Sequence, residues 1–446
     1  MKKVLSIGMI AVMLLMLLAG CGSGKEAGTD QTSQQEKTGE SAAPNAEPGE
    51  PVTLTFASWS ITEEATKDAL EQMVEMYKQI KPNVTIEFIG IPFGDIKQQT
   101  FVMASSNNTP DIIQTFSATF PTYATSDIIM PLNDLLGQDY IDDLMPSMVA
   151  DYSYNGQLMG VPWAPSPYVL YYNKELFKQA GLEDRPPATY DEMIEMAKAI
   201  SQLKTDSGEP IYGFGEATDK LPINGMISLR NIYSFGGSIF DEKGQVNVNT
   251  PQVVETLQFY QDLVNNNISP QGAKLKDLRN LFSIGRLGMY MDGYYGKAVF
   301  RSLSGKGEEF DKEWGVALVP KNKTDQSVSI AEAHGLVVAA DSKHKQEAAD
   351  FIKFLTDKDA ISLYHQKSDV LTSRISLSES PEFNASEFDK VLIEQLQTAK
   401  SLPANNPGLE QAYLDMSEAV QRVSVAKEDP AKVAADLNAK LQQILK

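Results

Sequence analysis

Alternation of apolar and polar residues over positions 52–57 predicts a half-buried strand. Apolar residues then recur at helical spacing from Ser60 to Pro82, and Ser60 with Glu63 has the spacing of a capping box. Positions 84–88 alternate again. A strand, a helix and a strand within about 40 residues form a βαβ unit. This unit predicts an α/β fold with a parallel or mixed sheet and helices on its faces.

The same patterns continue along the chain and predict a second α/β unit. Asn155-Gly156 is typical of a hairpin turn, and Asn173 and Thr189 are each placed to cap a helix. Further strands are expected at 111–116, 168–172, 287–291, 315–319 and 335–339, and further helices at 95–105, 190–203, 250–264 and over most of the chain after Lys345. Strand ends of two such units would line a cleft, which is the usual ligand position in open α/β sheets.

Residues 1–20 have the pattern of a secretory signal peptide. Two lysines precede an apolar run at 4–18, which is shorter than the roughly 20 residues of a membrane-spanning helix. Residues 18–21, Leu-Ala-Gly-Cys, resemble the bacterial lipobox, in which the signal is cut before the cysteine and the cysteine carries lipid. We therefore expect lipidation at Cys21 and a location on the outer face of the cell membrane. The alternative is an ordinary cleavage site with an incidental cysteine.

The segment that follows Cys21 has the composition of a tether. Residues 22–50 contain no large apolar side chain, so they cannot bury a core and are expected to be disordered. As a flexible coil the segment would reach roughly 30 Å. It would separate a globular body from the lipid headgroups.

Composition narrows the function classes. The chain has 446 residues, enough for two domains after the signal and tether are removed. Its net charge is -20, which argues against nucleic acid and anionic lipid as partners of the body. Cys21 is the only cysteine, so the body has no disulfide, thiol nucleophile or thiolate metal site.

The sequence gives little support for a catalytic, metal-binding or nucleotide-binding site. The three histidines are not paired at metal-ligand spacing, and no Gly-Lys-Ser/Thr phosphate loop occurs. We therefore expect neither a metal nor a cofactor. The acidic pairs Asp142-Asp143 and Glu63-Glu64 are typical of solvated faces, although a catalytic carboxylate pair is not excluded by sequence.

Five stretches have a specific order and spacing. They are residues 57–60 (ASWS), 109–113 (TPDII), 154–174, 282–295 and 314–320. Together they resemble the bacterial extracellular solute-binding proteins of the maltose-binding type, which are receptors of carbohydrate-importing ABC transporters. The resemblance implies a two-lobed periplasmic-binding-protein-like fold, with ligand held between lobes that close about a hinge.

The resemblance also implies how the chain is divided and what it binds. The implied crossings between lobes lie near 166–169, 315–320 and 369–371. The N-terminal lobe would comprise residues 51–166 and 318–368, and the C-terminal lobe residues 167–317 and 369–446. The implied partners of this monomeric, non-enzymatic receptor are a carbohydrate and the transmembrane subunits of an ABC permease.

Candidate binding residues are aromatic and polar side chains near predicted strand ends and crossings. A sugar presents hydroxyl groups and flat C–H faces that pack on aromatic rings. The candidates are Trp59, Trp163, Tyr294 and Tyr295 for packing, and Ser58, Gln114, Ser117, Ser166, Glu216, Asp292 and His334 for hydrogen bonding. The alternatives are core packing for the aromatic residues, loop solvation for the polar ones and a structural role for His334.

The sequence departs from the maltose receptors at two places. Residues 114–117 lack the tryptophan and charged groups that the resemblance implies, and Ser166 stands where an acid is expected. These departures argue against maltodextrin and leave the sugar open. Two other hypotheses remain: a secreted glycan-acting enzyme with two carboxylates, and the same fold with a phosphorylated or cationic solute. No basic cluster is evident near the expected cleft, which disfavours a phosphate.

Overall fold

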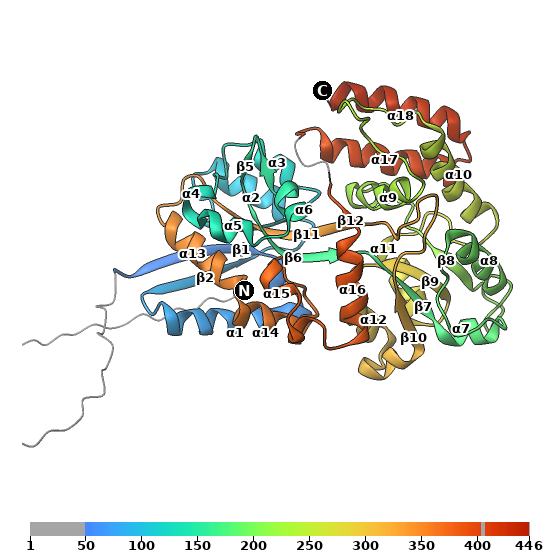
Figure 1. The fold of residues 1–446 in the computed structure, drawn as a ribbon, viewed down its shortest axis with the longest axis horizontal. Helices are drawn as coiled ribbons and strands as arrows, with labels where there is room; N and C mark the ends of the chain where they lie inside the picture. Colours follow the sequence, from blue (N-terminus) through green and yellow to red (C-terminus); the bar gives the residue numbers. More distant parts are fainter. Residues whose placement is uncertain (1–49, 403–405, 446) are drawn as a thin grey trace, which may run out of the picture. The chain divides into compact units, whose positions relative to one another are not determined.

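The computed structural model describes residues 50–402 and 406–445 (Figure 1). The predicted signal, Cys21 and residues 22–49 of the predicted tether lie outside the described residues, so the predictions made for them are not tested by the fold. Within the described ranges, no helix is both long and apolar enough to cross a membrane.

The first sheet is mixed. Its strands are β1 (Val52–Ser58), β2 (Val84–Gly90), β3 (Ile112–Phe116), β6 (Val161–Pro167), β11 (Ser329–Val338) and β12 (Ala399–Lys400). Their order is β12-β11-β3-β1-β2, with β6 paired to β11. β1 is parallel to β2 and β3, whereas β11 is antiparallel to β3 and β6. This arrangement confirms the sheet predicted from the βαβ pattern.

The second sheet has the order β10-β7-β9-β8. Its strands are β7 (Val169–Asn173), β8 (Tyr212–Gly215), β9 (Leu287–Asp292) and β10 (Trp314–Ala317). β8 and β9 are parallel, and β7 is antiparallel to β9 and β10. Tyr168 is the single residue between β6 of the first sheet and β7 of the second, and the chain returns to the first sheet between β10 and β11.

Helices lie beside both sheets (Figure 1). Those between β1 and β6 or between β11 and β12 are α1 (Glu64–Ile80), α2 (Ile96–Ser105), α3 (Phe120–Ala124), α4 (Asn133–Leu136), α5 (Gln138–Asp142), α6 (Pro146–Asp151), α13 (Lys345–Leu355), α14 (Lys358–Ser368), α15 (Ile375–Ser378) and α16 (Glu387–Gln397). The others are α7 (Lys174–Gln179), α8 (Tyr190–Ile200), α9 (Pro222–Ser234), α10 (Pro251–Asn265), α11 (Leu275–Ser283), α12 (Gly296–Ser304), α17 (Leu409–Ser424) and α18 (Pro430–Ile444). In this second group, α17 packs on α9, α10 and α18.

Shorter elements connect these helices and strands. They are the 3-10 turns η1 (Ser60–Thr62), η2 (Gly307–Glu313) and η3 (Pro381–Phe383), and the hairpin of β4 (Ser153–Tyr154) with β5 (Gln157–Leu158). The hairpin turn is the predicted one, because Asn155 and Gly156 both have positive φ, at 50° and 76°.

The start of the first helix differs from its prediction. Residues Ser60–Thr62 form η1, and α1 begins only at Glu64. The Glu63 side chain makes no capping hydrogen bond, so the expected capping box is absent. The Ser60 amide donates instead to the Ser58 hydroxyl at 3.1 Å, and this contact holds the segment against the end of β1.

Two other caps are confirmed. The Asn173 side chain accepts a hydrogen bond from the Leu176 amide, and the Thr189 side chain accepts one from the Glu192 amide. Both caps satisfy amides of a first helical turn that have no partner within the helix. Such contacts span only three residues, which is why sequence alone predicts them.

Candidate ligand-binding site

Candidate residues from both sheets lie at the carboxyl ends of parallel strands. In the first sheet, β1 ends at Ser58 and Trp59 follows it. In the second, β8 ends directly before Glu216 and β9 ends at Asp292. The segments of both sheets meet where Tyr294 donates its amide hydrogen to the Ser166 hydroxyl at 3.3 Å. We call this region the sheet junction: Ser166, Tyr168, Arg230, Arg279, Asp292, Tyr294, Tyr295 and Glu332.

Three polar side chains, from β1, β3 and the turn η1, bind one another. The Ser58 hydroxyl donates to Gln114 Oε1 at 2.6 Å, and Gln114 Nε2 donates to the Ser60 hydroxyl at 2.9 Å. All three side chains are buried. In this structure the network holds the ends of β1 and β3 together and satisfies its own polar atoms.

Trp59 and His334 pack together beside this network. Their ring centroids are 4.9 Å apart, and the Trp59 ring also meets Phe93 and Phe116 edge-on. Burial lowers the pKa of His334 to about 4, so the imidazole is neutral near pH 7. His334 lies within β11 and not at a strand start, because β11 begins at Ser329, six residues before the expected strand.

Trp163 and Ser117 have interior positions in the first sheet. The Trp163 ring is fully buried and lies 5.0 Å from the ring of Tyr364. The Ser117 hydroxyl accepts a hydrogen bond from the Ala333 amide at 3.0 Å, which ties β3 to β11. In this structure both side chains therefore pack in the interior of the protein.

Ser166 has an acid directly across the sheet. Glu332 of β11 is its partner in the antiparallel ladder with β6. Directly opposed residues of an antiparallel pair have side chains on the same face of the sheet, with Cβ atoms about 4.5–5.5 Å apart. The acid that the resemblance leads one to expect at Ser166 is therefore supplied by the neighbouring strand.

Glu332 is joined to two tyrosines from the second-sheet side. The Tyr168 hydroxyl donates to Glu332 Oε2 at 3.0 Å, and the Tyr295 hydroxyl donates to the Tyr168 hydroxyl at 3.3 Å. Glu332 is 3% exposed. Burial raises its pKa to about 7, against the lowering effect of the Tyr168 hydrogen bond and the Arg279 charge.

Asp292 is held by an arginine. Arg279 of α11 donates from Nε and Nη2 to the two carboxylate oxygens at 2.7 and 3.0 Å. The same guanidinium lies 5.0 Å from the centroid of the Tyr295 ring. This bidentate pair supports one side of the Tyr295 ring at the junction.

Glu216 is likewise paired with an arginine. Arg230 Nη2 of α9 donates to Glu216 Oε1, and both side chains are buried. Asn231 Nδ2 also donates to Glu216 Oε1, at 3.2 Å. The Arg230 guanidinium lies 5.8 Å from the centroid of the Tyr168 ring, which places the pair beside the junction.

No basic cluster near the expected cleft is evident from the sequence, and the structure places two separate arginines there, one on α9 and one on α11. Arg230 and Arg279 both contact junction tyrosines, but each is neutralised by a carboxylate of its own. Glu332 and Arg230 were not among the candidates predicted from sequence. The available signals were an acid within the apolar run of β11 and an arginine within the apolar α9. Charged residues inside buried elements are rarely unpaired.

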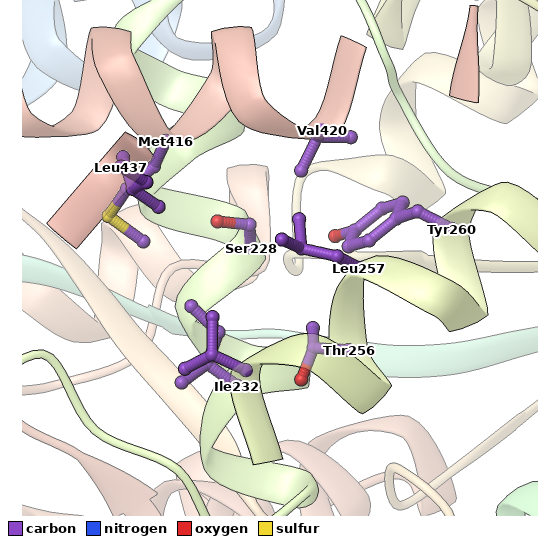
Figure 2. Close-up of a pocket in the computed structure, with 9 residues that line it drawn as sticks. Ser228, Ile232, Thr256, Leu257, Tyr260, Met416, Val420 and Leu437 are labelled. Carbon is purple, nitrogen blue, oxygen red and sulfur yellow. The ribbon is translucent and has the colours of Figure 1, made fainter. Parts of the chain in front are cut away.

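An apolar cavity occurs elsewhere, among α9, α10, α17 and α18. Figure 2 shows side chains from these helices around it, including Ile232, Leu257, Val420 and Leu437. Its volume is about 10 Å³, near the minimum for one water molecule. The cavity is therefore a packing defect between helices and too small for a sugar.

Curated relatives with named ligands share most of the chain. The arabinooligosaccharide-binding protein of Bacillus subtilis is 25% identical over 378 residues, which is 79% of this chain and 76% of the relative. The mannitol-binding protein of Pseudomonas aeruginosa is 22% identical over 353 residues, 76% of this chain and 78% of the relative.

Solved structures share the fold. The GacH receptor of Streptomyces glaucescens has a TM-score of 0.78 at 23% identity, over 89% of this chain and 98% of that one. Maltose-bound MalE3 of T. maritima has a TM-score of 0.75 at 23% identity, over 88% of this chain and 100% of that one. The family model for bacterial extracellular solute-binding proteins matches residues 60–361. With the fold and more than half of the chain matched, this protein belongs to the family of bacterial extracellular solute-binding proteins.

Proposed function

We propose that the protein is the substrate-binding lipoprotein of an ABC importer. It binds a sugar or oligosaccharide reversibly between two lobes and delivers it to the transmembrane subunits of the permease. Lipid on Cys21 keeps the monomeric protein at the outer face of the cell membrane. Membership in a solute-binding family excludes the glycan-acting enzyme considered from sequence.

One observation carries the carbohydrate assignment. At the sheet junction, the carboxyl of Glu332 on β11 meets the hydroxyl of Tyr168, between β6 and β7, and the hydroxyl of Tyr295, after β9, binds that of Tyr168. Carboxylates and phenol groups bind sugar hydroxyls, and aromatic rings pack on sugar C–H faces. The names of the relatives support the same class, because arabinooligosaccharide and mannitol are both rich in hydroxyl groups.

The proposed lobes keep the boundaries expected from sequence. Residues 51–166 with 318–368 form the N-terminal lobe, and residues 167–317 with 369–446 form the C-terminal lobe. The ligand lies between them, and opening of the lobes admits it. Junction residues that approach it are Tyr168, Tyr294, Tyr295, Asp292 and Glu332, with Trp59 from the end of β1.

Mass spectrometry of small molecules retained through native purification tests this proposal. We expect a carbohydrate bound at about one per chain, and a matching change in intrinsic fluorescence when the same sugar is returned to the emptied protein. A retained solute without sugar chemistry, or a complete sugar panel without any fluorescence or calorimetric response, would overturn the carbohydrate assignment.

A variant ties binding to the junction. Tyr295→Ala removes both the hydroxyl that reaches Tyr168 and the ring beside Arg279. We expect affinity to fall by on the order of 1–3 kcal/mol, as for a buried aromatic anchor. Tyr154→Ala, in the β4–β5 hairpin, is the matched control and leaves affinity unchanged.

A further inference from the structure

Glu332 is a buried carboxyl group that has no ion-pair partner within the part of the chain that the structure describes. It accepts a hydrogen bond from the neutral hydroxyl of Tyr168. Among residues 50–402 and 406–445, no lysine, arginine or histidine forms an ion pair with it, whereas the two neighbouring arginines pair with other carboxylates. Its side chain is nonetheless almost fully buried at the sheet junction.

The arginines near Glu332 are already neutralised. Arg279 gives two hydrogen bonds to Asp292, and Arg230 pairs with Glu216. Among the described residues of the junction and the adjacent Glu216, three carboxyl groups therefore share two guanidinium groups. The uncompensated acid is Glu332, because each of the other two has a direct charge-assisted contact.

We propose that Glu332 makes the site selective for a carbohydrate that carries a protonated amino group, over the neutral sugar of the same shape. This inference rests on the carbohydrate-binding function proposed above and specifies its ligand class. A ligand ammonium group would donate hydrogen bonds to the carboxylate and supply the missing positive charge.

The physical reason is the cost of a buried, unpaired charge. Removing an ionised carboxyl group from water is strongly unfavourable in free energy unless a cation or strong hydrogen-bond donors replace the water. A sugar hydroxyl replaces a hydrogen bond but adds no charge, so the site would hold Glu332 protonated when a neutral sugar is bound. Burial already raises the pKa of Glu332 to about 7. A ligand ammonium would keep the carboxyl ionised.

Calorimetric titration of the detergent-solubilised full chain with matched sugar pairs tests the proposal. The pairs are glucosamine with glucose, galactosamine with galactose, and the fully deacetylated chitosan dimer with cellobiose. We expect the amino member of the best-binding pair to bind at least about tenfold more tightly, and its N-acetylated form to lose that advantage. Equal or tighter binding of the neutral member in that pair overturns the inference.

Glu332→Gln removes the charge while preserving the size of the side chain. The ratio of amino-sugar to neutral-sugar affinity should fall to about one in this variant. Glu195→Gln, which removes one exposed acid from α8, should keep the wild-type ratio. Persistence of the preference in Glu332→Gln would contradict the inference, and the N-acetylation comparison decides the same question in the wild-type chain if the variant does not fold.

The two proposals fail in different ways. If neutral sugars bind as well as their amino counterparts, the carbohydrate function stands and the charge selectivity is wrong. If no sugar of either kind binds, both are wrong.

Discussion

Glu332 lies directly opposite Ser166 in the antiparallel ladder between β11 and β6. The acid that the resemblance implies at position 166 of β6 is therefore found on the neighbouring strand β11, still at the junction. The Ser166 hydroxyl is then free to accept the amide hydrogen of Tyr294. A carboxylate at position 166 would stand beside Glu332, and two like charges in a buried site repel each other.

Stability should fall more steeply between about pH 5 and pH 8 in the wild type than in Glu332→Gln. The pKa of Glu332 is raised from 4.5 to about 7, so the folded chain retains a proton that the unfolded chain releases. This contribution is present below about pH 4.5 and is lost as pH rises through about 7. We expect a difference on the order of 1–3 kcal/mol from denaturant unfolding at the two pH values.

The contributions of other titrating groups to the pH dependence of stability cancel when the wild type and Glu332→Gln are compared. The groups that face Glu332 are Tyr168, Asp292, Arg279 and Tyr295, and all are present in both proteins. His334 has the opposite sign, because its lowered pKa removes stability as pH falls from about 6.5 toward 4, and it too is common to both. Identical slopes for wild type and variant would show that Glu332 titrates normally.

Removal of one member of the Arg230–Glu216 pair should be far more harmful than removal of both. Arg230→Met leaves the Glu216 carboxylate buried without its cation, which costs about 3–5 kcal/mol. Arg230→Met with Glu216→Gln should recover most of this loss, as measured by urea unfolding. Lys323→Met, which breaks an exposed pair with Glu255, should change stability by less than about 1 kcal/mol.

Gly293→Ala should disturb the junction directly. A Cβ at this position would overlap the Ser166 hydroxyl and the Tyr295 ring. We expect a stability loss of about 1–3 kcal/mol and weaker ligand binding, because the segment carrying both tyrosines must move. Gly94→Ala is the control, since its Cβ would meet nothing within 4 Å. An unchanged affinity in Gly293→Ala would place the ligand away from this segment.

Cys21→Ser should release the protein from the cell surface without changing its affinity for ligand. Lipid attachment requires the thiol, whereas the binding residues lie beyond a 29-residue segment without large apolar side chains. Fractionation of cells into membrane and medium, followed by titration of the released protein, measures both quantities. Ser23→Ala should remain with the membrane. Retention of Cys21→Ser at the surface would mean that another anchor exists.

Local interactions explain which parts of the fold were predictable. The strand at β1 and the buried face of α1 follow from periodicity, and the Asn173 and Thr189 caps act within three residues. The capping box predicted at Ser60 does not form, because Ser60 also has a partner much further away than three residues. Ser58 and Gln114 bind Ser60, and the second of these partners lies 54 residues away.

The sequence by itself determined the α/β class, most of the element types and the strand ends at which Trp59 and Asp292 stand. It did not predict β8, the strand that ends directly before Glu216. The tertiary structure decided which groups meet there. Glu332 and Tyr168 are 164 residues apart in the chain, and the ladder of β11 with β6 brings them together. Periodicity reports which face of an element is buried, whereas charge pairing depends on contacts across the sheets. For that reason only the tertiary structure revealed Glu332 as the acid at the junction.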